Sequence, residues 1–449
     1  MATSPARIVA LVLALVMMTG PGGARPPSPS EQAMAAGDMQ RARQLAQQQL
    51  QVNPNDTSAL AVLAAADLAQ QRPKAARQNA SKAFAAGETH HDRFVAARLA
   101  AKSAHLGGQP LVAQYWLRRA VHVAPHPQAE QVAIADFRAL RRVSPLHLSF
   151  AASFRPSANV NNGAENPMLS IDGVPTYFVF NDASRALPGA ETRLGLGLRY
   201  RLAGTEKRGT DLGIQMTQSA IFLTDRARRI APMARGADFA TASVDLQLSR
   251  YAEISERSFL RGGLQIGQSW LAGDAYARRA KLDAALTHRL SPVVQARLSM
   301  AVERQWRIGA SPAATALVVD SAAERKLASG DVIGIRFTAG KTVSDDANQE
   351  NHSLASELRY VLGDTVAGVH LSGTLGLALR DYPVFFGGVF GDSGRQDKTA
   401  FGSIDLSLTR LKALGFEPVI SLEGRRTRSN VSRFESNSLG LGVRIKSSF

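Results

Sequence analysis

The sequence predicts a membrane protein of two parts, an α-helical repeat region followed by a transmembrane antiparallel β-barrel of about 14 strands. Three observations support this α + β fold class. Of the 37 glycines, 30 lie beyond residue 145. In that same part, apolar and polar residues alternate with a period of two. Before it, an alanine-rich stretch repeats after 71 residues.

Residues 1–24 have the layout of a secretory signal peptide. Arg7 supplies a positive charge, the run 8–18 is uncharged, and small residues lead up to Ala24, after which we expect cleavage. As a helix, the uncharged run would cover about half of a ~30 Å hydrocarbon core, which disfavours a membrane anchor. We therefore expect an exported protein, with residues 25–30 as a linker.

Residues 31–145 are predicted to be helical and to form a periplasmic domain. They hold only four glycines and much alanine; alanine is the best helix former, and glycine inside a helix costs about 1 kcal/mol. Four residues recur after 71 positions: Gly37, Ala42, Pro54 and Asn55 return as Gly108, Ala113, Pro125 and His126. That displacement equals two units of about 34 plus a short insertion, which is the tetratricopeptide period. We expect about three helix pairs and a capping helix over 132–143; an irregular helical bundle is the alternative.

Residues 146–449 are predicted to form the barrel. Alternating stretches are typical of strands with one apolar and one polar face, as in 193–202, 243–249, 294–303, 333–338, 404–409 and 439–446. A soluble sandwich would show the same pattern. The barrel is favoured because the segments run about nine to fourteen residues, longer than the usual ~5–6. Full charges also lie mid-strand on the polar face, which a water-filled interior tolerates. The strand-like segments from His147 onward number about fourteen, and bacterial barrels have an even number of strands.

The net charge of +16 does not indicate nucleic-acid binding. Residues 31–145 carry 14 basic and 8 acidic side chains, and residues 146–449 carry 37 and 29, so the excess is shared between the two parts. Basic pairs such as Arg278-Arg279 lie in strand contexts, without a recognition helix. We expect no nucleic-acid partner. Arginines near strand ends are candidates for binding an anionic outer leaflet, and solvated loops are the alternative.

No motif predicts a catalytic, cofactor or metal site. The chain has no cysteine, which excludes disulfides, thiolate metal sites and cysteine nucleophiles. Residues 90–92 (His-His-Asp) are expected to lie in a solvated turn, and the helix carrying His122 is expected to break at Pro125 before His126. Signatures of hydrolases, zinc proteases and phosphate-binding loops are missing from the sequence. We expect a protein that is not an enzyme; a hydrolase assembled from distant strands is the alternative.

Motifs at both ends of the predicted barrel resemble those of the surface lipoprotein assembly modulator (Slam) family. The segment 154–161 contains Asn159 and Asn161 and resembles the family's proline-plus-N-x-N opening. The segment 426–431 resembles its R-x-R-S-N stretch and precedes a last strand that ends in the aromatic Phe449. The order of the predicted domains also resembles that of the family over nearly the whole mature chain. Aromatic residues, at 6%, are fewer than in many family members.

The resemblance implies an outer-membrane factor that delivers exported proteins, often surface lipoproteins, to the cell surface by binding alone. Its partners would be the client, the client's periplasmic chaperone, outer-membrane lipid and the barrel assembly machinery. Asn159, Asn161 and Asn430, with Phe449, are candidate structural or client-path residues that pin the segments entering and closing the barrel. Turn formation, which asparagine favours, is an equal alternative. An exopolysaccharide export porin with repeats, a passive porin and a soluble periplasmic sandwich adaptor are the other classes.

Overall fold

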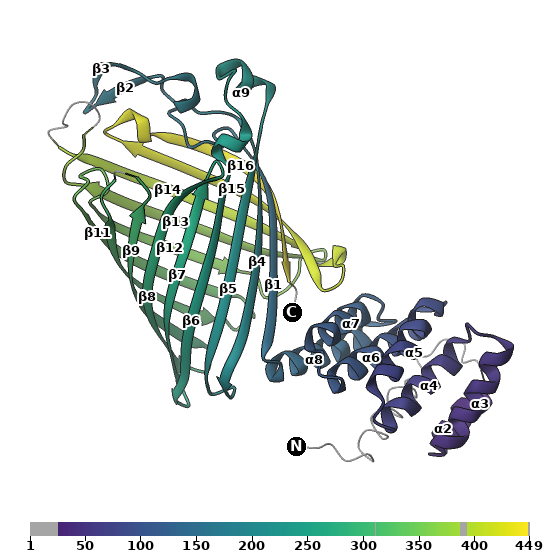
Figure 1. Ribbon diagram of the computed structural model, residues 1–449. Coiled ribbons are helices and arrows are strands. Elements are labelled where there is room, and N and C mark those ends of the chain that lie inside the picture. Colours follow the sequence, from purple (N-terminus) through teal and green to yellow (C-terminus); the bar gives the residue numbers. More distant parts are fainter. Residues whose placement is uncertain (1–25, 310, 387–392, 448–449) are drawn as a thin grey trace. The chain divides into compact units, whose positions relative to one another are not determined.

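The computed structural model describes residues 26–309, 311–386 and 393–447, so the predicted signal peptide and Phe449 lie outside the described residues. The chain forms two compact units (Figure 1). One consists mainly of the residues up to His147, and the other mainly of those from Leu148 onward.

Among its described residues, the first unit has seven helices. They are α2 (Pro29–Ala35), α3 (Met39–Val52), α4 (Thr57–Ala69), α5 (Pro73–Ala86), α6 (His90–Leu106), α7 (Pro110–His122) and α8 (Pro127–Val143). Each packs against the next, and α2 also contacts α4 as α4 contacts α6, which makes a stack of helix pairs followed by α8. Within the described residues, no helix has the length and hydropathy needed to cross a bilayer. Whether the pairs are true tetratricopeptide repeats stays a prediction.

Small side chains let these helices pack closely. The contacts between them are filled by alanines that are fully buried, such as Ala42, Ala46, Ala64, Ala76, Ala80, Ala97 and Ala113. Burial of an alanine costs no side-chain entropy, and its small side chain lets the helix backbones approach closely. The repeated Ala42 and Ala113 both lie in this core, so the repeat that the sequence shows is a packing repeat.

Two helices begin earlier than the sequence predicts. Helix α2 begins at Pro29, within the stretch expected as a linker, because Ser28 and Glu31 form a capping box and Pro29 is tolerated in the first turn. Helix α8 begins at Pro127 instead of 132, capped by His126, whose Nδ1 accepts from the Ala129 N–H at 3.2 Å. Proline at the first position explains both early starts.

The expected turn at residues 90–92 is wrong. These residues are the first turn of α6, because Thr89 and Asp92 form a capping box with each other's backbone. The expected break after His122 is confirmed, since α7 ends there and His126 lies outside it.

A buried carboxylate ties three of the helices together. Asp67 of α4 is 2% exposed. It accepts hydrogen bonds from Arg43 of α3 at 2.7 Å, from Arg72 at 2.7 Å and from Asn79 of α5 at 2.9 Å. Burial raises the pKa of Asp67, although the charge of Arg43 and the Asn79 hydrogen bond lower it.

We expect Asp67→Asn to change how the stability of the helical unit depends on pH. Since the folded pKa lies above the unfolded value of about 3.9, the contribution of Asp67 is largest below that value and is lost as pH rises through the folded pKa. The variant should therefore gain stability relative to the wild type between pH 4 and pH 7. Thermal melts followed by helix circular dichroism at both pH values measure this, and a difference that stays constant would contradict it.

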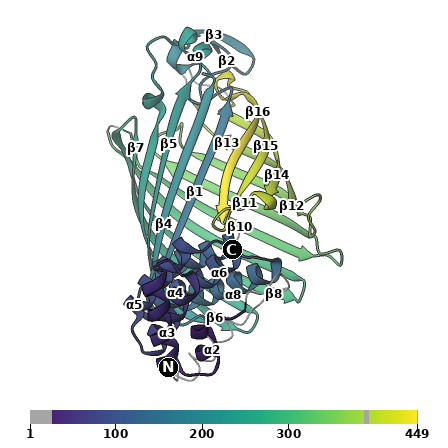
Figure 2. The ribbon, with the colours of Figure 1, turned by 90° about the vertical axis from the view of Figure 1, so that its right-hand side faces the viewer.

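Fourteen strands close into an antiparallel barrel. They are β1 (Leu146–Ser157), β4 (Gly189–Gly204), β5 (Arg208–Leu223), β6 (Thr241–Ser255), β7 (Ser258–Leu271), β8 (Asp274–Ser291), β9 (Val294–Arg307), β10 (Ala314–Lys326), β11 (Val332–Ser344), β12 (Asn351–Val361), β13 (Val369–Tyr382), β14 (Arg395–Leu408), β15 (Phe416–Ser429) and β16 (Ser436–Ser447). The predicted number and the barrel are confirmed. Strand β1 closes the ring against β16, with Phe154 opposite Val443 (Figure 2).

The two ends of the barrel carry different connections. At one end, here called the loop end, β1 leads into residues 158–188, which contain the hairpin β2 (Met168–Ile171) and β3 (Val174–Val179). At the same end, residues 224–240 carry the short helix α9 (Asp225–Ile230). The opposite end has short turns such as 205–207 and 256–257. Figure 1 shows β2, β3 and α9 together at the loop end. Bacterial barrels place such long loops outside the cell and short turns in the periplasm.

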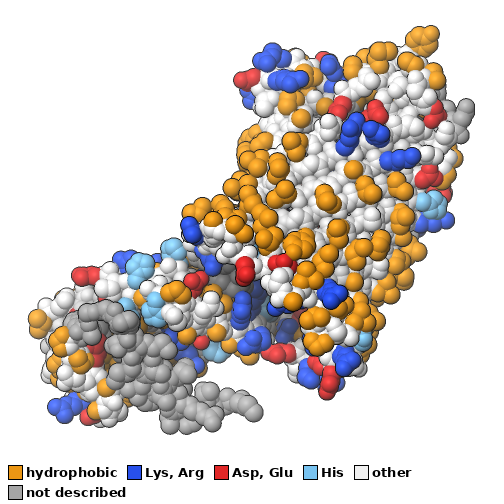
Figure 3. Space-filling view, turned by 180° about the vertical axis from the view of Figure 1, so that it is seen from behind, with side chains coloured by type: hydrophobic (Ala, Val, Ile, Leu, Met, Phe, Trp, Pro, Cys, Tyr) orange, Lys and Arg blue, Asp and Glu red, His pale blue; other side chains and the backbone are white. Residues whose placement is uncertain are grey.

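The barrel wall is apolar outside and polar inside. Leu194, Leu196 and Tyr200 are each more than 40% exposed on one face of β4, and Figure 3 shows apolar side chains spread over the outer wall. The neighbours of Tyr200, Arg199 and Arg201, face the interior and pair with Asp211. The barrel strands are 11 to 18 residues long, so the longest exceed the expected maximum length of fourteen residues. An apolar belt around a closed barrel with a charged interior is the architecture of outer-membrane proteins.

Candidate functional site

Two acid–base pairs of the interior wall reach across an intervening strand. Arg279 of β8 donates to Asp245 of β6 at 2.8 Å, and Arg444 of β16 donates to Asp405 of β14 at 2.8 Å. The strand between them contributes a small residue each time. Ser421 of β15 donates to Asp405 at 2.5 Å. These pairs neutralise one another and leave a polar, wettable surface, as a water-filled lumen requires.

Gly267 of β7 makes room for one of these pairs. A Cβ atom at this position would lie 1.9 Å from Asp245 Oδ1 and 3.1 Å from Arg279 Nε. Only a residue without a side chain lets the two charges meet over the strand between them. Glycine on the polar face of a strand therefore has a specific role here.

Alternation separates the basic pairs seen in the sequence. Arg279 faces the interior, whereas Arg278 lies opposite Trp306 on the outer face. In the same way Arg425 lies over the Phe401 ring, at 5.4 Å from its centroid, on the inside, while Arg426 faces outward. The two members of such a pair are therefore in different environments, because a strand directs neighbouring side chains to opposite faces.

The β2–β3 hairpin packs onto other loops at the loop end. Its Leu169 and Ile171 form a buried cluster with Phe385 and Val431, and Phe180 and Phe434 pack against it. We call this set the loop cluster. The Ser170 N–H donates to Ser432 Oγ at 2.9 Å, and Ser432 Oγ donates to the Met168 carbonyl at 3.0 Å. The cluster joins the first long loop to the β13–β14 and β15–β16 connections.

Arg395 fixes the loop cluster to the interior face of the barrel. It is 7% exposed and lies between the rings of Tyr382 and Phe434, at 3.7 and 3.5 Å from their centroids. Its guanidinium donates twice to one oxygen of Asp397, at 3.1 and 2.9 Å. Burial and the charge of Arg395 together lower the pKa of the nearby Arg433. No sequence motif marks Arg395, because its partners come from three separate segments.

Asn430 is the hydrogen-bonding centre of the loop cluster. Its Oδ1 accepts from the Gln396 N–H at 2.7 Å, and its Nδ2 donates to Asp172 Oδ1 at 2.8 Å and to the Gly394 carbonyl at 3.1 Å. The Asp172 N–H donates to the Asn430 carbonyl at 2.8 Å. One side chain therefore joins the hairpin of the first loop to the start of β14.

Asn159 and Asn161 hold the start of the same long loop. Asn161 Nδ2 donates to the carbonyls of Ala183 and Arg185 at 2.9 and 2.7 Å, and its Oδ1 accepts from the Leu187 N–H at 2.9 Å. Asn159 exchanges two hydrogen bonds with the Gly163 backbone. Asn161 thus bridges distant segments, while Asn159 closes a local turn. Both lie at the loop end, and Phe449 lies outside the described residues.

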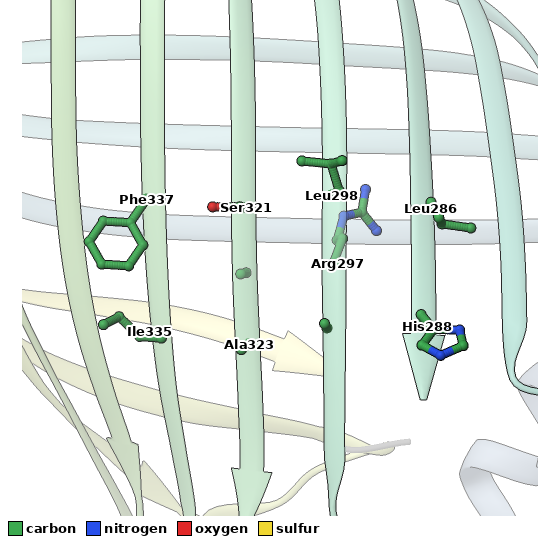
Figure 4. A pocket seen from close by; sticks show the side chains of 10 residues that line it. Leu286, His288, Arg297, Leu298, Ser321, Ala323, Ile335 and Phe337 are labelled. Carbon is green, nitrogen blue, oxygen red and sulfur yellow. The ribbon is translucent and has the colours of Figure 1, made fainter. Parts of the chain in front are cut away.

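A depression of about 330 Å³ lies on the outer wall of β8 to β11. Figure 4 shows Leu286, Leu298, Ile335 and Phe337 around it, with His288 at one edge. Leu286 lies opposite Leu298, whose 54% exposure places this face outside. The depression therefore faces lipid and does not belong to the interior.

The described part of the chain offers few arrangements of side chains that could bind a metal ion or catalyse a reaction. It holds no group of three His, Asp or Glu side chains that could bind a metal ion. Ser258 Oγ and His288 Nδ1 lie 2.8 Å apart. Among the described residues, no carboxylate hydrogen-bonds to this histidine, so the pair lacks the orienting acid of a catalytic triad.

Several solved barrels are similar to this chain over about two thirds of its length. The Vibrio cholerae outer-membrane protein OmpT is 8% identical, covering 67% of this chain and 98% of its own, with a TM-score of 0.36. The Acinetobacter baumannii outer-membrane channel DcaP is 10% identical over 67% and 96%, with a TM-score of 0.38. An anion-selective porin from Comamonas acidovorans is 10% identical, covering 68% of this chain and 100% of its own, with a TM-score of 0.35. No protein-family model and no curated protein matches the chain.

Proposed function

We propose that this protein delivers exported client proteins, such as surface lipoproteins, across or into the outer membrane. The observation that supports the proposal is the direct fusion of a helical stack to a 14-strand barrel, with only Ser144 and Pro145 between α8 and β1. Stacked helix pairs present an extended surface suited to binding other proteins. A barrel that serves only as a passive pore needs no such region.

The charged interior is the second feature that fits a route for a polar chain. Several of its carboxylates are paired with guanidinium groups, as Asp245 is with Arg279 and Asp405 with Arg444. Such pairs keep the wall wettable, which suits the passage of a polar chain. The Slam-like segments that contain Asn161 and Asn430 both lie at the loop end, where a client would leave the barrel. In this proposal the helices lie in the periplasm and capture the client or its chaperone, and the protein catalyses no covalent step.

Deleting residues 29–143 tests the proposal. We expect the remaining barrel to fold, with heat-modifiable migration on a denaturing gel as the control, and surface exposure of a genetically neighbouring lipoprotein to fall at least about tenfold while its total amount persists. Protease accessibility on intact cells measures exposure. Unchanged exposure of every neighbouring client would overturn the proposal in favour of a passive porin. Loss of surface polysaccharide instead would favour the export porin.

A further inference from the structure

Six basic side chains lie on the outer face of the barrel within four residues of its loop end. They are Arg278 of β8, Arg304 of β9, Lys341 of β11, Lys398 of β14, and Arg426 and Arg428 of β15. All six are exposed. They face outward because each lies an even number of residues from an exposed apolar residue of its own strand, as Arg304 does from Leu298 and Met300. We call this set the basic sector.

The basic sector lacks the counter-charges found inside the barrel. Several interior arginines pair with strand carboxylates, as Arg199, Arg279 and Arg444 do, but among the described residues none of the six makes an ion pair. Two make neutral contacts only: Arg278 donates to Gln268 at 3.3 Å, and Arg304 donates to Thr315 at 3.3 Å. At this level the outward carboxylate of Asp381 lies opposite His352.

Two of these cations lie directly opposite each other. Lys398 pairs with Arg428 in the β14–β15 register, and Arg426 lies two residues along on the same face. Side chains opposite each other in an antiparallel pair have Cβ atoms about 4.5 to 5.5 Å apart, and like charges there are destabilising. An anion bound between them removes the repulsion and gives each cation a partner.

The depth of the sector is that of lipid headgroups. Trp306, which is 41% exposed, lies opposite Arg278 on the outer face. Tryptophan on the outer face of a barrel marks the boundary between hydrocarbon and headgroups. Figure 3 shows basic side chains on the wall above its apolar belt. At the same level on β5 and β7, the outward residues Gln218 and Gln268 are neutral, so the charge is confined to one side of the barrel.

We propose that the basic sector binds the phosphorylated headgroup of a glycolipid in the leaflet at the loop end, with Lys398, Arg426 and Arg428 as its centre. Long loops lie outside in bacterial barrels, so this is the outer leaflet, whose lipopolysaccharide carries phosphates on its lipid A. Guanidinium and ammonium groups are the natural partners of phosphate oxygens. The site is independent of client delivery, because it faces lipid and not the interior.

The test compares two triple variants of the full chain. The variant Lys398→Gln, Arg426→Gln and Arg428→Gln removes the centre of the sector. The matched control, Arg208→Gln, Arg250→Gln and Arg325→Gln, removes three outward arginines near the short-turn end. Bisphosphorylated lipid A is titrated into each detergent-solubilised protein, and bound lipid is counted by native mass spectrometry. Heat-modifiable migration confirms folding.

We expect the centre variant to lose affinity for lipid A about 100-fold, and the control to stay within about threefold of the wild type. Monophosphorylated lipid A should bind the wild type more weakly than the bisphosphorylated form. Equal affinities of both variants and the wild type would overturn the proposal. So would phosphatidylglycerol binding as tightly as lipid A, because this would indicate a general anionic surface. If the triple variant does not fold, Arg428→Gln alone should still lower the affinity, and an unchanged affinity would overturn the proposal.

Discussion

Replacing Gly267 by alanine should destabilise the barrel by about 2 to 4 kcal/mol, somewhat below the ~3–5 kcal/mol for breaking a fully buried ion pair, because the Arg279 side chain is 30% exposed. The added Cβ would lie only 1.9 Å from Asp245 Oδ1, well inside contact distance, and 3.1 Å from Arg279 Nε. Asp245 is 4% exposed, so its carboxylate cannot move into bulk water without breaking the pair. Urea unfolding of the detergent-folded protein, followed by tryptophan fluorescence and gel migration, measures the change.

Gly262 on the same strand is the matched control. A Cβ there would meet only the Asp283 carbonyl oxygen, at an ordinary 3.6 Å, and would face outward. Gly262→Ala should therefore be neutral or slightly stabilising, because alanine reduces the entropy of the unfolded chain. In an Asp245→Ala background, Gly267→Ala should lose most of its effect. Equal costs for Gly267→Ala and Gly262→Ala would show that the ion pair is not the reason for the glycine.

Replacing Asn430 by aspartate should release the loop cluster. The change removes the Nδ2–H donors to Asp172 and to the Gly394 carbonyl and puts a second carboxylate beside Asp172. Losing hydrogen bonds to partly buried acceptors costs about 2 to 3 kcal/mol in sum. We expect chymotrypsin to cleave after Phe180, which packs on the loop cluster, roughly 30- to 150-fold faster, since cleavage follows the open population.

Two variants check the cause of that release. Asn166→Asp in the same loop keeps its one described role, accepting from the Met168 N–H at 3.0 Å, and should leave cleavage unchanged. Adding Asp172→Asn to Asn430→Asp removes the repulsion and should restore much of the protection. If cleavage rises equally in the two single variants, Asn430 is not the centre of the cluster.

The repeat and the alternation were sufficient to predict the two parts of the chain. Helix positions followed from alanine and proline, because these residues act through local backbone preferences. Strand faces followed from a period of two, because each strand turns successive side chains to opposite sides. The early start at Pro29 and the first turn of α6 at residues 90–92 were missed. In both cases a capping box extended the helix beyond the point where its apolar pattern starts.

The candidate site was predicted only in part. Asn161 and Asn430 stood out in the sequence, but their partners lie 22 to 26 residues away for Asn161 and 34 to 258 residues away for Asn430. No local pattern announces such contacts. Nothing in the sequence distinguishes Arg395 from the other arginines on the polar faces of strands. Its role depends on the Tyr382 and Phe434 rings on either side of it, which only the structure shows.

By itself the sequence determined the helical region, the barrel and the number of its strands, all of which depend on short-range periodicity and backbone preference. Tertiary structure decided which charges meet. It paired Asp245 with Arg279 across Gly267, turned Arg278 outward beside its inward neighbour, and brought Lys398 opposite Arg428. The reason is that the register between strands, set by closure of the whole ring, fixes every cross-strand neighbour. A stretch of sequence fixes only the face to which each side chain points.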